Sequence, residues 1–168
     1  MQAPLKIYKN AAGWLDCAGQ YGLGLIVIRV LMAYEYGKAG LGKLAGNNWF
    51  GNVQDNFIFP FNVVPVEISW LLATWFEILG AAGLLLGLFT RFWALSLIIM
   101  TIVAISGVHW PAEWHSLGEL WEGYRVTAQD GSGNYRIPLL FIAMLLPLLI
   151  SGAGKLSLDR VLAKRFLS

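Results

Sequence analysis

The chain has 168 residues, of which 57% are hydrophobic and 13% charged, and its mean hydropathy is +0.60. This composition excludes an ordinary soluble domain and predicts a protein embedded in lipid. The formal net charge of +2 comes from basic residues near both ends and in one turn, which excludes the basic stripe of a nucleic-acid-binding protein. The single cysteine, Cys17, excludes a disulfide framework, a C-x-x-C redox pair and a cysteine-based metal cluster within the chain.

Residues 1–22 precede the first long apolar stretch. They lack the uninterrupted apolar core and the cleavage site of a signal peptide, so we expect this segment to stay on the chain. Trp14 and Tyr21, beside Lys6 and Lys9, are typical of a segment that lies in the headgroup layer of a membrane.

Four apolar stretches follow, each near the roughly 20 residues that a bilayer-crossing helix needs. We expect the spans at about 23–44, 68–89, 92–109 and 137–150, within a single domain that covers residues 1–168. The predicted fold class is therefore an all-α membrane protein, built as a bundle of four transmembrane helices.

The first two spans carry ionisable residues at membrane depth. Arg29, Glu35 and Lys38 lie in the first span, and Glu77 lies near the middle of the second. Such a side chain in hydrocarbon costs roughly 2.5–3.5 kcal/mol on insertion scales, so each is a candidate ligand-binding or proton-handling residue. Counting about 1.5 Å per residue places Glu35, Lys38 and Glu77 in one layer. Arg29 lies about two turns deeper, but its long side chain could reach Glu77 and form a bidentate pair.

Two interpretations of this polar layer stay open. In the first, it is a buried ion-pair network that only fixes the register of the helices. In the second, it is a polar pocket in which Glu77 accepts a hydrogen bond or a proton from a lipid-soluble ligand. Helical periodicity places Glu35 and Lys38 on one face and Arg29 on another, so the sequence does not require one cluster of all four residues.

The second span also contains a pattern of small residues. Gly83 and Gly87 form a G-x-x-x-G pair, and Gly80 adds another notch one turn earlier. Small residues let helices approach closely in a membrane. We expect these glycines to pack against helices of the same bundle, and self-association of two chains is the alternative.

Four candidate metal ligands occur at the end of the third span and in the loop after it: His109, Glu113, His115 and Glu119. Imidazole and carboxylate groups suit zinc, copper or iron. Their spacing matches no named metal motif, and Pro111 interrupts any continuous helix that would align them. The preferred interpretation is therefore an aromatic and histidine belt at the headgroup level, with a metal site as the alternative.

The C-terminal segment has the signals of a further short helix. Gly152 and Gly154 can end the fourth span, and Ser157 with Asp159 can cap the next helix. The apolar and basic residues that follow fall on opposite faces of that helix. This pattern predicts an interfacial C-terminal helix.

The distribution of Lys and Arg predicts the orientation of the chain. Lys6 and Lys9, Arg91 in the second turn and the basic residues after the fourth span all fall on one side. By the positive-inside rule that side is cytoplasmic, so both termini are expected there and the loops 45–66 and 110–135 on the opposite side. The expected location is the inner membrane of a bacterium.

Several motifs resemble the DoxX family of small four-helix membrane proteins. The segments that carry the resemblance are Glu77-Ile-Leu-Gly80, Leu84-Leu-Leu-Gly87-Leu-Phe-Thr90-Arg91 and Gly152-Ala-Gly154-Lys155-Leu-Ser157-Leu158-Asp159, with Arg29, Gly40 and Lys43 in the first span. The resemblance implies that Arg29, Glu77 and Arg91 are the first positions to consider, with Arg91 as an anchor of the turn. It implies structural roles for Gly40, Lys43, Gly80, Gly87 and Thr90.

A narrower resemblance concerns the outer part of the chain. Tyr34-Glu35-Tyr36, Asn48-Trp49-Phe50 and His109-Trp110 are similar to a subgroup of the family whose members accompany copper-responsive clusters that encode peptide-modifying enzymes. Other relatives implied by the family resemblance include the membrane subunit of a thiosulfate:quinone oxidoreductase and accessory proteins of redox maturation or oxidative-stress complexes.

Two hypotheses about function follow. In the first, the chain is an accessory or quinone-interacting subunit of a redox or metal-stress maturation system, where Glu77, Glu35 and Lys38 hold a quinone head group and a partner protein supplies the electrons. In the second, it is a non-catalytic membrane scaffold that docks a partner through its outward loops. The sequence contains no recognisable nucleophile or flavin motif and leaves open whether the protein is an enzyme.

Overall fold

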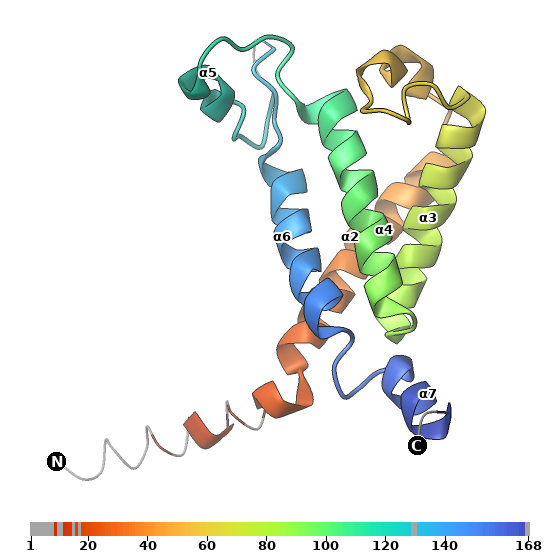
Figure 1. Ribbon diagram of the computed structural model, residues 1–168, viewed down its shortest axis with the longest axis vertical. Helices are drawn as coiled ribbons and strands as arrows, with labels where there is room; N and C mark the ends of the chain where they lie inside the picture. The colour runs from red at the N-terminus through yellow and green to blue at the C-terminus, as the bar shows by residue number, and fades with distance from the viewer. Residues whose placement is uncertain (1–8, 10–11, 15, 17, 129–130, 167–168) are drawn as a thin grey trace, which may run out of the picture.

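The computed structural model describes residues 9, 12–14, 16, 18–128 and 131–166 (Figure 1). Helices and turns make up this part of the chain, and no β-strand occurs among these residues. The expected all-α fold class is confirmed. Lys6 and Cys17, which the sequence analysis used for orientation and redox chemistry, lie outside the described residues.

Four long helices of the described residues form a bundle: α2 (Leu23–Ala45), α3 (Val66–Leu86), α4 (Thr90–Ala104) and α6 (Arg136–Ser151). Helix α2 packs on α3, α3 on α4 and α4 on α6, and α6 closes the ring by contacting α2. Each helix coincides closely with one of the apolar stretches in the sequence, because an apolar run of this length is stable in lipid only when its backbone groups are hydrogen-bonded within a helix.

The core of the bundle is made of apolar side chains from every helix of the ring. Met32 of α2, Leu84 of α3, Leu97 of α4 and Leu145 and Leu148 of α6 have no exposed surface. The outer faces of the same helices are also apolar. This pattern of an apolar core with an apolar outside is typical of a bundle that is surrounded by lipid.

Two helices of the described residues are long and apolar enough to cross a membrane: α3, and α4 together with its continuation to His109. Helix α2 meets the same criteria only together with the helical segment before Gly22, across a bend of 56°. The reason is its polar content, since α2 carries Arg29, Glu35, Lys38 and Lys43. Helix α6 is apolar but shorter, and it completes the bundle by packing on α4 and α2.

The two ends of the bundle differ (Figure 1). The loop end carries the segments 46–65, 110–128 and 131–135, whereas the terminal end gathers the start of α2, the turn 87–89, the end of α6 and the short helix α7 (Leu158–Phe166). Apolar Leu158, Val161 and Leu162 are exposed on one face of α7, and basic Arg160 and Lys164 lie on the opposite face. A short amphipathic helix at the C-terminus is therefore confirmed.

The loop end holds short helical turns: η1 (Phe50–Asn52), η2 (Gln54–Asn56), the π turn η3 (Ile105–His109) and α5 (Leu117–Glu122). The π turn is closed by Trp110 N–H, which donates to the Ile105 carbonyl at 2.7 Å. Phe57 fills the space beside Gly107, where a Cβ atom would lie 2.2 Å from the Phe57 ring. The third predicted span therefore ends as a π turn, in which Gly107 leaves room for the ring of Phe57 from the segment 46–65.

The C-terminal segment corrects one expectation. Ser157 caps α7 as predicted, because its hydroxyl accepts from Arg160 N–H at 3.2 Å. Asp159 instead accepts from the N–H groups of Phe89 and Thr90, at 2.7 and 3.0 Å, and so caps α4. Helix α4 follows a tight turn and has no capping side chain of its own at Phe89, so the cap comes from a residue distant in the sequence.

Candidate functional site

Arg29 lies in the second turn of α2, at the terminal end, and only 4% of its surface is exposed. Its guanidinium donates to four carbonyl oxygens of the described residues, at 2.7 Å (Leu84), 2.8 Å (Leu85), 3.0 Å (Ala153) and 2.9 Å (Leu156). The last carbonyls of a helix lack intrahelical partners, so the end of α3 supplies acceptors for it. The structure therefore does not bring Arg29 to Glu77, and the pair considered from the sequence is wrong.

Glu77 is paired with Lys43 instead. The Lys43 ammonium lies 2.8 Å from Oε1 and 2.7 Å from Oε2 of Glu77. The two side chains retain 16% and 11% of their surface exposed, respectively. The sequence analysis gave Lys43 only the structural role that the family resemblance implies. Its four-carbon side chain reaches back along the helix to the carboxylate.

Gly40 brings α2 and α3 together beside this ion pair. A Cβ atom at Gly40 would lie 2.8 Å from Ile78 Cγ1 and 3.0 Å from Glu77 Cβ, which is closer than ordinary packing. The absence of a side chain therefore lets the two helices approach at the depth of Glu77. This contact is a structural role for Gly40, as the resemblance implied.

A second polar contact lies one turn before Gly40. The Tyr36 hydroxyl lies 2.6 Å from Thr101 Oγ1, and Thr101 in turn donates to the Leu97 carbonyl at 2.7 Å. Because the Thr101 proton is used in that bond, the Tyr36 hydroxyl is the donor to Thr101. We refer to Tyr36, Lys43, Glu77 and Thr101 as the polar patch, which α2, α3 and α4 build together.

Glu35 and Lys38 do not belong to the polar patch. Glu35 is half-buried and Lys38 is exposed, and neither forms an ion pair with any described residue. The side of α2 that faces the bundle is formed by residues spaced three or four apart, and Lys43 continues that row. Glu35 and Lys38 lie off the row, so the predicted layer of Glu35, Lys38 and Glu77 is not assembled.

The remaining motif residues cluster at the terminal end and along α3. Gly87 has a left-handed φ of 65°, and a Cβ atom there would lie 2.5 Å from Arg29 Nη2. Thr90 is fully buried, and Arg91 donates to the Ile150 carbonyl at 3.0 Å, which ties α4 to the end of α6. Gly80 faces Leu97 and Gly83 faces Trp93, so these glycines pack within the same chain.

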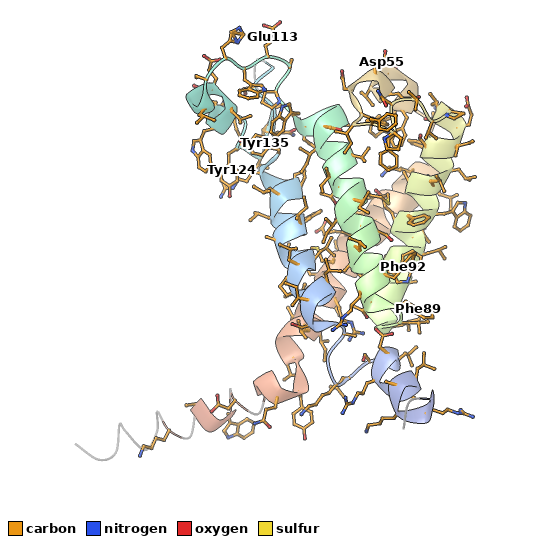
Figure 2. The ribbon with its side chains drawn as sticks, in the orientation of Figure 1. Asp55, Phe89, Phe92, Glu113, Tyr124 and Tyr135 are labelled. Atoms are coloured by element: carbon orange, nitrogen blue, oxygen red, sulfur yellow. The ribbon has the colours of Figure 1, made fainter. Side chains whose placement is uncertain are left out.

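The four candidate metal ligands are not gathered into one site, although His115 Nδ1 lies 3.9 Å from Glu119 Oε2. His109 Nδ1 lies 2.8 Å from Asn134 Oδ1, and Glu113 projects from the loop end (Figure 2). Glu119 accepts from His115 N–H at 2.8 Å, while its own N–H donates to Ser116 Oγ at 3.2 Å, which is a capping box at the start of α5. No group of three or more His, Cys, Asp and Glu side chains is placed to hold a metal ion in the part of the chain that the structure describes.

The cavities lie away from the polar patch. A hollow of about 690 Å³ opens at the terminal end between the start of α2, the turn before α4 and α7, and a smaller one of about 460 Å³ lies beside it. The polar patch lines neither of them.

Comparison with known proteins gives two matches. The family model described as DoxX matches residues 24–110, which include α2, α3, α4 and the polar patch. An uncharacterized protein of Haemophilus influenzae is 38% identical to the chain over 152 residues, which cover 89% of this chain and 91% of the relative. No solved structure matches the chain significantly.

Proposed function

The chain belongs to the DoxX family of membrane proteins, and from this premise we propose that it is an accessory subunit of a redox or metal-stress maturation system whose polar patch binds a quinone head group. The observation that carries the proposal is the Lys43–Glu77 ion pair, which lies inside the bundle and remains partly exposed. An ionisable pair at membrane depth is costly, and such groups commonly serve binding or proton transfer.

The chemistry of the polar patch suits this ligand. The carbonyl oxygens of a quinone accept hydrogen bonds, and two of the three N–H donors of Lys43 are directed to Glu77. The third donor of Lys43 is available to a carbonyl oxygen of the head group. Tyr36 lies two turns before Lys43 on α2 and directs its proton to Thr101, which fixes the orientation of its ring.

The depth of the polar patch also suits a lipid-soluble molecule. Glu77 follows the first residue of α3, Val66, by about three turns, which places it about 16 Å from the loop end of that helix. A head group at this depth would come from the bilayer along the outer surface of α2 and α3. The long apolar tail would stay in the hydrocarbon.

The proposal assigns proton exchange to this chain and electron transfer to a partner. Reduction of a quinone to a quinol consumes two electrons and two protons. A partner redox protein would supply both electrons. The Glu77 carboxyl group would pass protons from water at the loop end to the two ring oxygens, and would recover each proton from water.

Purification of the full chain in mild detergent, followed by solvent extraction and mass spectrometry, tests the proposal. We expect about one quinone per chain in the wild-type protein and in the control Lys38→Gln, whose exposed side chain lies outside the polar patch. We expect loss of the quinone from Glu77→Gln with the bundle still folded. Wild-type protein free of quinone, or a Glu77→Gln variant that retains it, would contradict the proposal.

A second candidate function rests on the loop end. Trp121 is 69% exposed and stacks on Tyr124 with ring centroids 4.9 Å apart, and Leu117 is 80% exposed. Exposed aromatic side chains are enriched at protein interfaces. In this alternative the chain is a non-catalytic scaffold that docks a maturation partner here. Trp121→Ser would then release a co-purified partner without changing the quinone content, whereas an unchanged complex would argue against it.

We also propose that the protein lies in the inner membrane of a bacterium with its loop end outside the cytoplasm. The positive-inside pattern supports this orientation. In a Cys17→Ala background, a membrane-impermeant thiol reagent applied to spheroplasts should label Glu113→Cys at the loop end but not Arg160→Cys on α7. The opposite labelling would reverse the proposed orientation.

A further inference from the structure

We propose that the larger hollow at the terminal end binds the phosphate head group of an anionic phospholipid. This hollow, about 690 Å³, lies between the start of α2, the turn before α4, and the segment that joins α6 to α7. It is separate from the polar patch, because the described residues that line the hollow do not include Tyr36, Lys43, Glu77 or Thr101. The proposal therefore does not depend on the proposed quinone site.

The charges around the hollow favour an anion. Its described lining includes three basic residues, Arg91, Lys155 and Arg160, and one acidic residue, Asp159. Both carboxylate oxygens of Asp159 are engaged by the N–H groups of Phe89 and Thr90, at 2.7 and 3.0 Å. The carboxylate keeps its negative charge, but three basic residues against one acidic residue leave the described lining with a net formal charge of about +2.

The basic side chains keep hydrogen-bond donors for a phosphate group. Arg91 directs Nη2 to the Ile150 carbonyl, and a guanidinium has further N–H donors on its other nitrogen atoms. The Lys155 ammonium lies 5.3 Å from the centre of the Tyr21 ring, a cation–π contact that uses no N–H donor. Arginine and lysine together form the usual binding chemistry for phosphate oxygens.

Thr90 provides a second, independent observation at the hollow. The residue lines the hollow and none of its surface is exposed, yet its Oγ1 atom has no hydrogen-bond partner among the described residues. Buried hydroxyl groups are nearly always hydrogen-bonded in proteins. Because the hydroxyl group has no exposed surface, a phosphate oxygen in the hollow would accept the Thr90 proton after a small movement of the side chains that cover it.

The apolar lining distinguishes a phospholipid from a free phosphate. Leu25, Phe89 and Phe92 also line the hollow, and the two phenylalanines are 63% and 53% exposed. Figure 2 shows Phe89 and Phe92 at the terminal end, on the outer side of the bundle beside α7. The ends of membrane-crossing helices lie at headgroup level, so these rings can contact acyl chains while the basic residues hold the phosphate.

Native mass spectrometry of the full chain in mild detergent tests the proposal, with phosphatidylglycerol, phosphatidylcholine and inorganic phosphate as separate probes. We expect phosphatidylglycerol to bind more tightly than phosphatidylcholine. The double variant Lys155→Gln/Arg160→Gln should weaken phosphatidylglycerol binding about 25-fold, from about fivefold for each basic residue near a membrane surface. Lys164→Gln, a matched loss of charge on α7 outside the hollow, should change binding less than twofold.

Thr90→Val separates lipid binding from structural damage, because valine keeps the volume of threonine and removes the unpartnered hydroxyl. We expect weaker binding of phosphatidylglycerol, while the unfolding temperature in lipid-free detergent stays the same or rises. Equal binding of the two phospholipids, or an equal effect of the double variant and Lys164→Gln, would overturn the proposal. Displacement of phosphatidylglycerol by equimolar inorganic phosphate would also overturn it, in favour of a site for small anions.

Discussion

Two cations on one helix, Arg29 and Lys43, are held in opposite ways. Arg29, near the start of α2, donates only to backbone carbonyls, which belong to the end of α3 and to the segment after α6. Lys43, near the end of α2, binds the side chain of Glu77. Carbonyls fixed by the fold hold Arg29 in place, whereas the partly exposed Lys43 and Glu77 side chains can separate. The difference teaches that backbone acceptors tie a charge to the fold more firmly than a side-chain partner does.

Among the tests of this comparison, we expect the largest effect from Arg29→Met. The substitution leaves carbonyl oxygens buried without donors, so we expect a loss of about 3 to 5 kcal/mol in the free energy of unfolding. Arg29→Lys keeps the charge but has fewer donors and should lose less. Unfolding in mild detergent, followed by circular dichroism, measures both. An Arg29→Met variant as stable as the wild type would remove the structural role assigned to this residue.

Gly40→Ala tests how tightly the fold holds the opposite region. The new methyl group would meet Ile78 and Glu77 at 2.8 and 3.0 Å, so the helices must separate. We expect a loss of about 1 to 3 kcal/mol in unfolding free energy, the usual cost of overpacking. Gly42→Ala is the matched control, because a Cβ atom there meets nothing within 4 Å. Equal effects of the two variants in the same unfolding assay would show that the close approach of α2 and α3 is unimportant.

The Lys43–Glu77 pair should contribute less to stability than Arg29. We expect Glu77→Gln to lower the free energy of unfolding by about 1 to 2 kcal/mol, because the partly exposed Lys43 loses its counter-charge but can turn outward. In the double variant Glu77→Gln/Lys43→Met the loss should be smaller than the sum of the two single losses. Strict additivity in this double-mutant cycle would mean that the pair contributes no coupling. A loss as large as that of Arg29→Met would erase the difference between the two regions.

The smallest effect is expected at Asp159, whose carboxylate caps α4 at the same end as Arg29. Asp159→Asn keeps a hydrogen-bond acceptor but removes the negative charge at the start of the helix, and we expect a loss of about 1 kcal/mol. Asp55→Asn, on the exposed turn η2, is the control and should have no measurable effect. If Asp159→Asn also leaves the free energy of unfolding unchanged, then α7 does not stabilise the terminal end through this cap.

Much of the fold followed from local patterns. The apolar runs located all four helices of the bundle, and the glycines of the second span indicated close helix packing. The C-terminal helix followed from Ser157 and from the amphipathic residues after it. These features are encoded by neighbours in the sequence, and a membrane strengthens such local signals because each spanning segment must satisfy its own backbone.

The contacts of the candidate site were harder to predict. Counting the rise per residue placed Glu35, Lys38 and Glu77 in one layer. The geometry of a single helix fixes only the depth of a residue and its angle within that helix. The rotation of α2 relative to α3 decided that Lys43, and not Lys38, meets Glu77. The family pattern that joins Gly40 and Lys43 was a usable signal, since a glycine followed three residues later by a cation places both on one helical face.

The sequence by itself determined that this is a helical membrane protein, where its four long helices lie along the chain, and which of them carry charged side chains. Composition and local hydrogen bonding are sufficient for those properties. Only the tertiary structure decided the partners of those charges: carbonyls for Arg29, Lys43 for Glu77 and the start of α4 for Asp159. Long flexible side chains can reach several alternatives at similar depth, and the packing of the four helices selects among them.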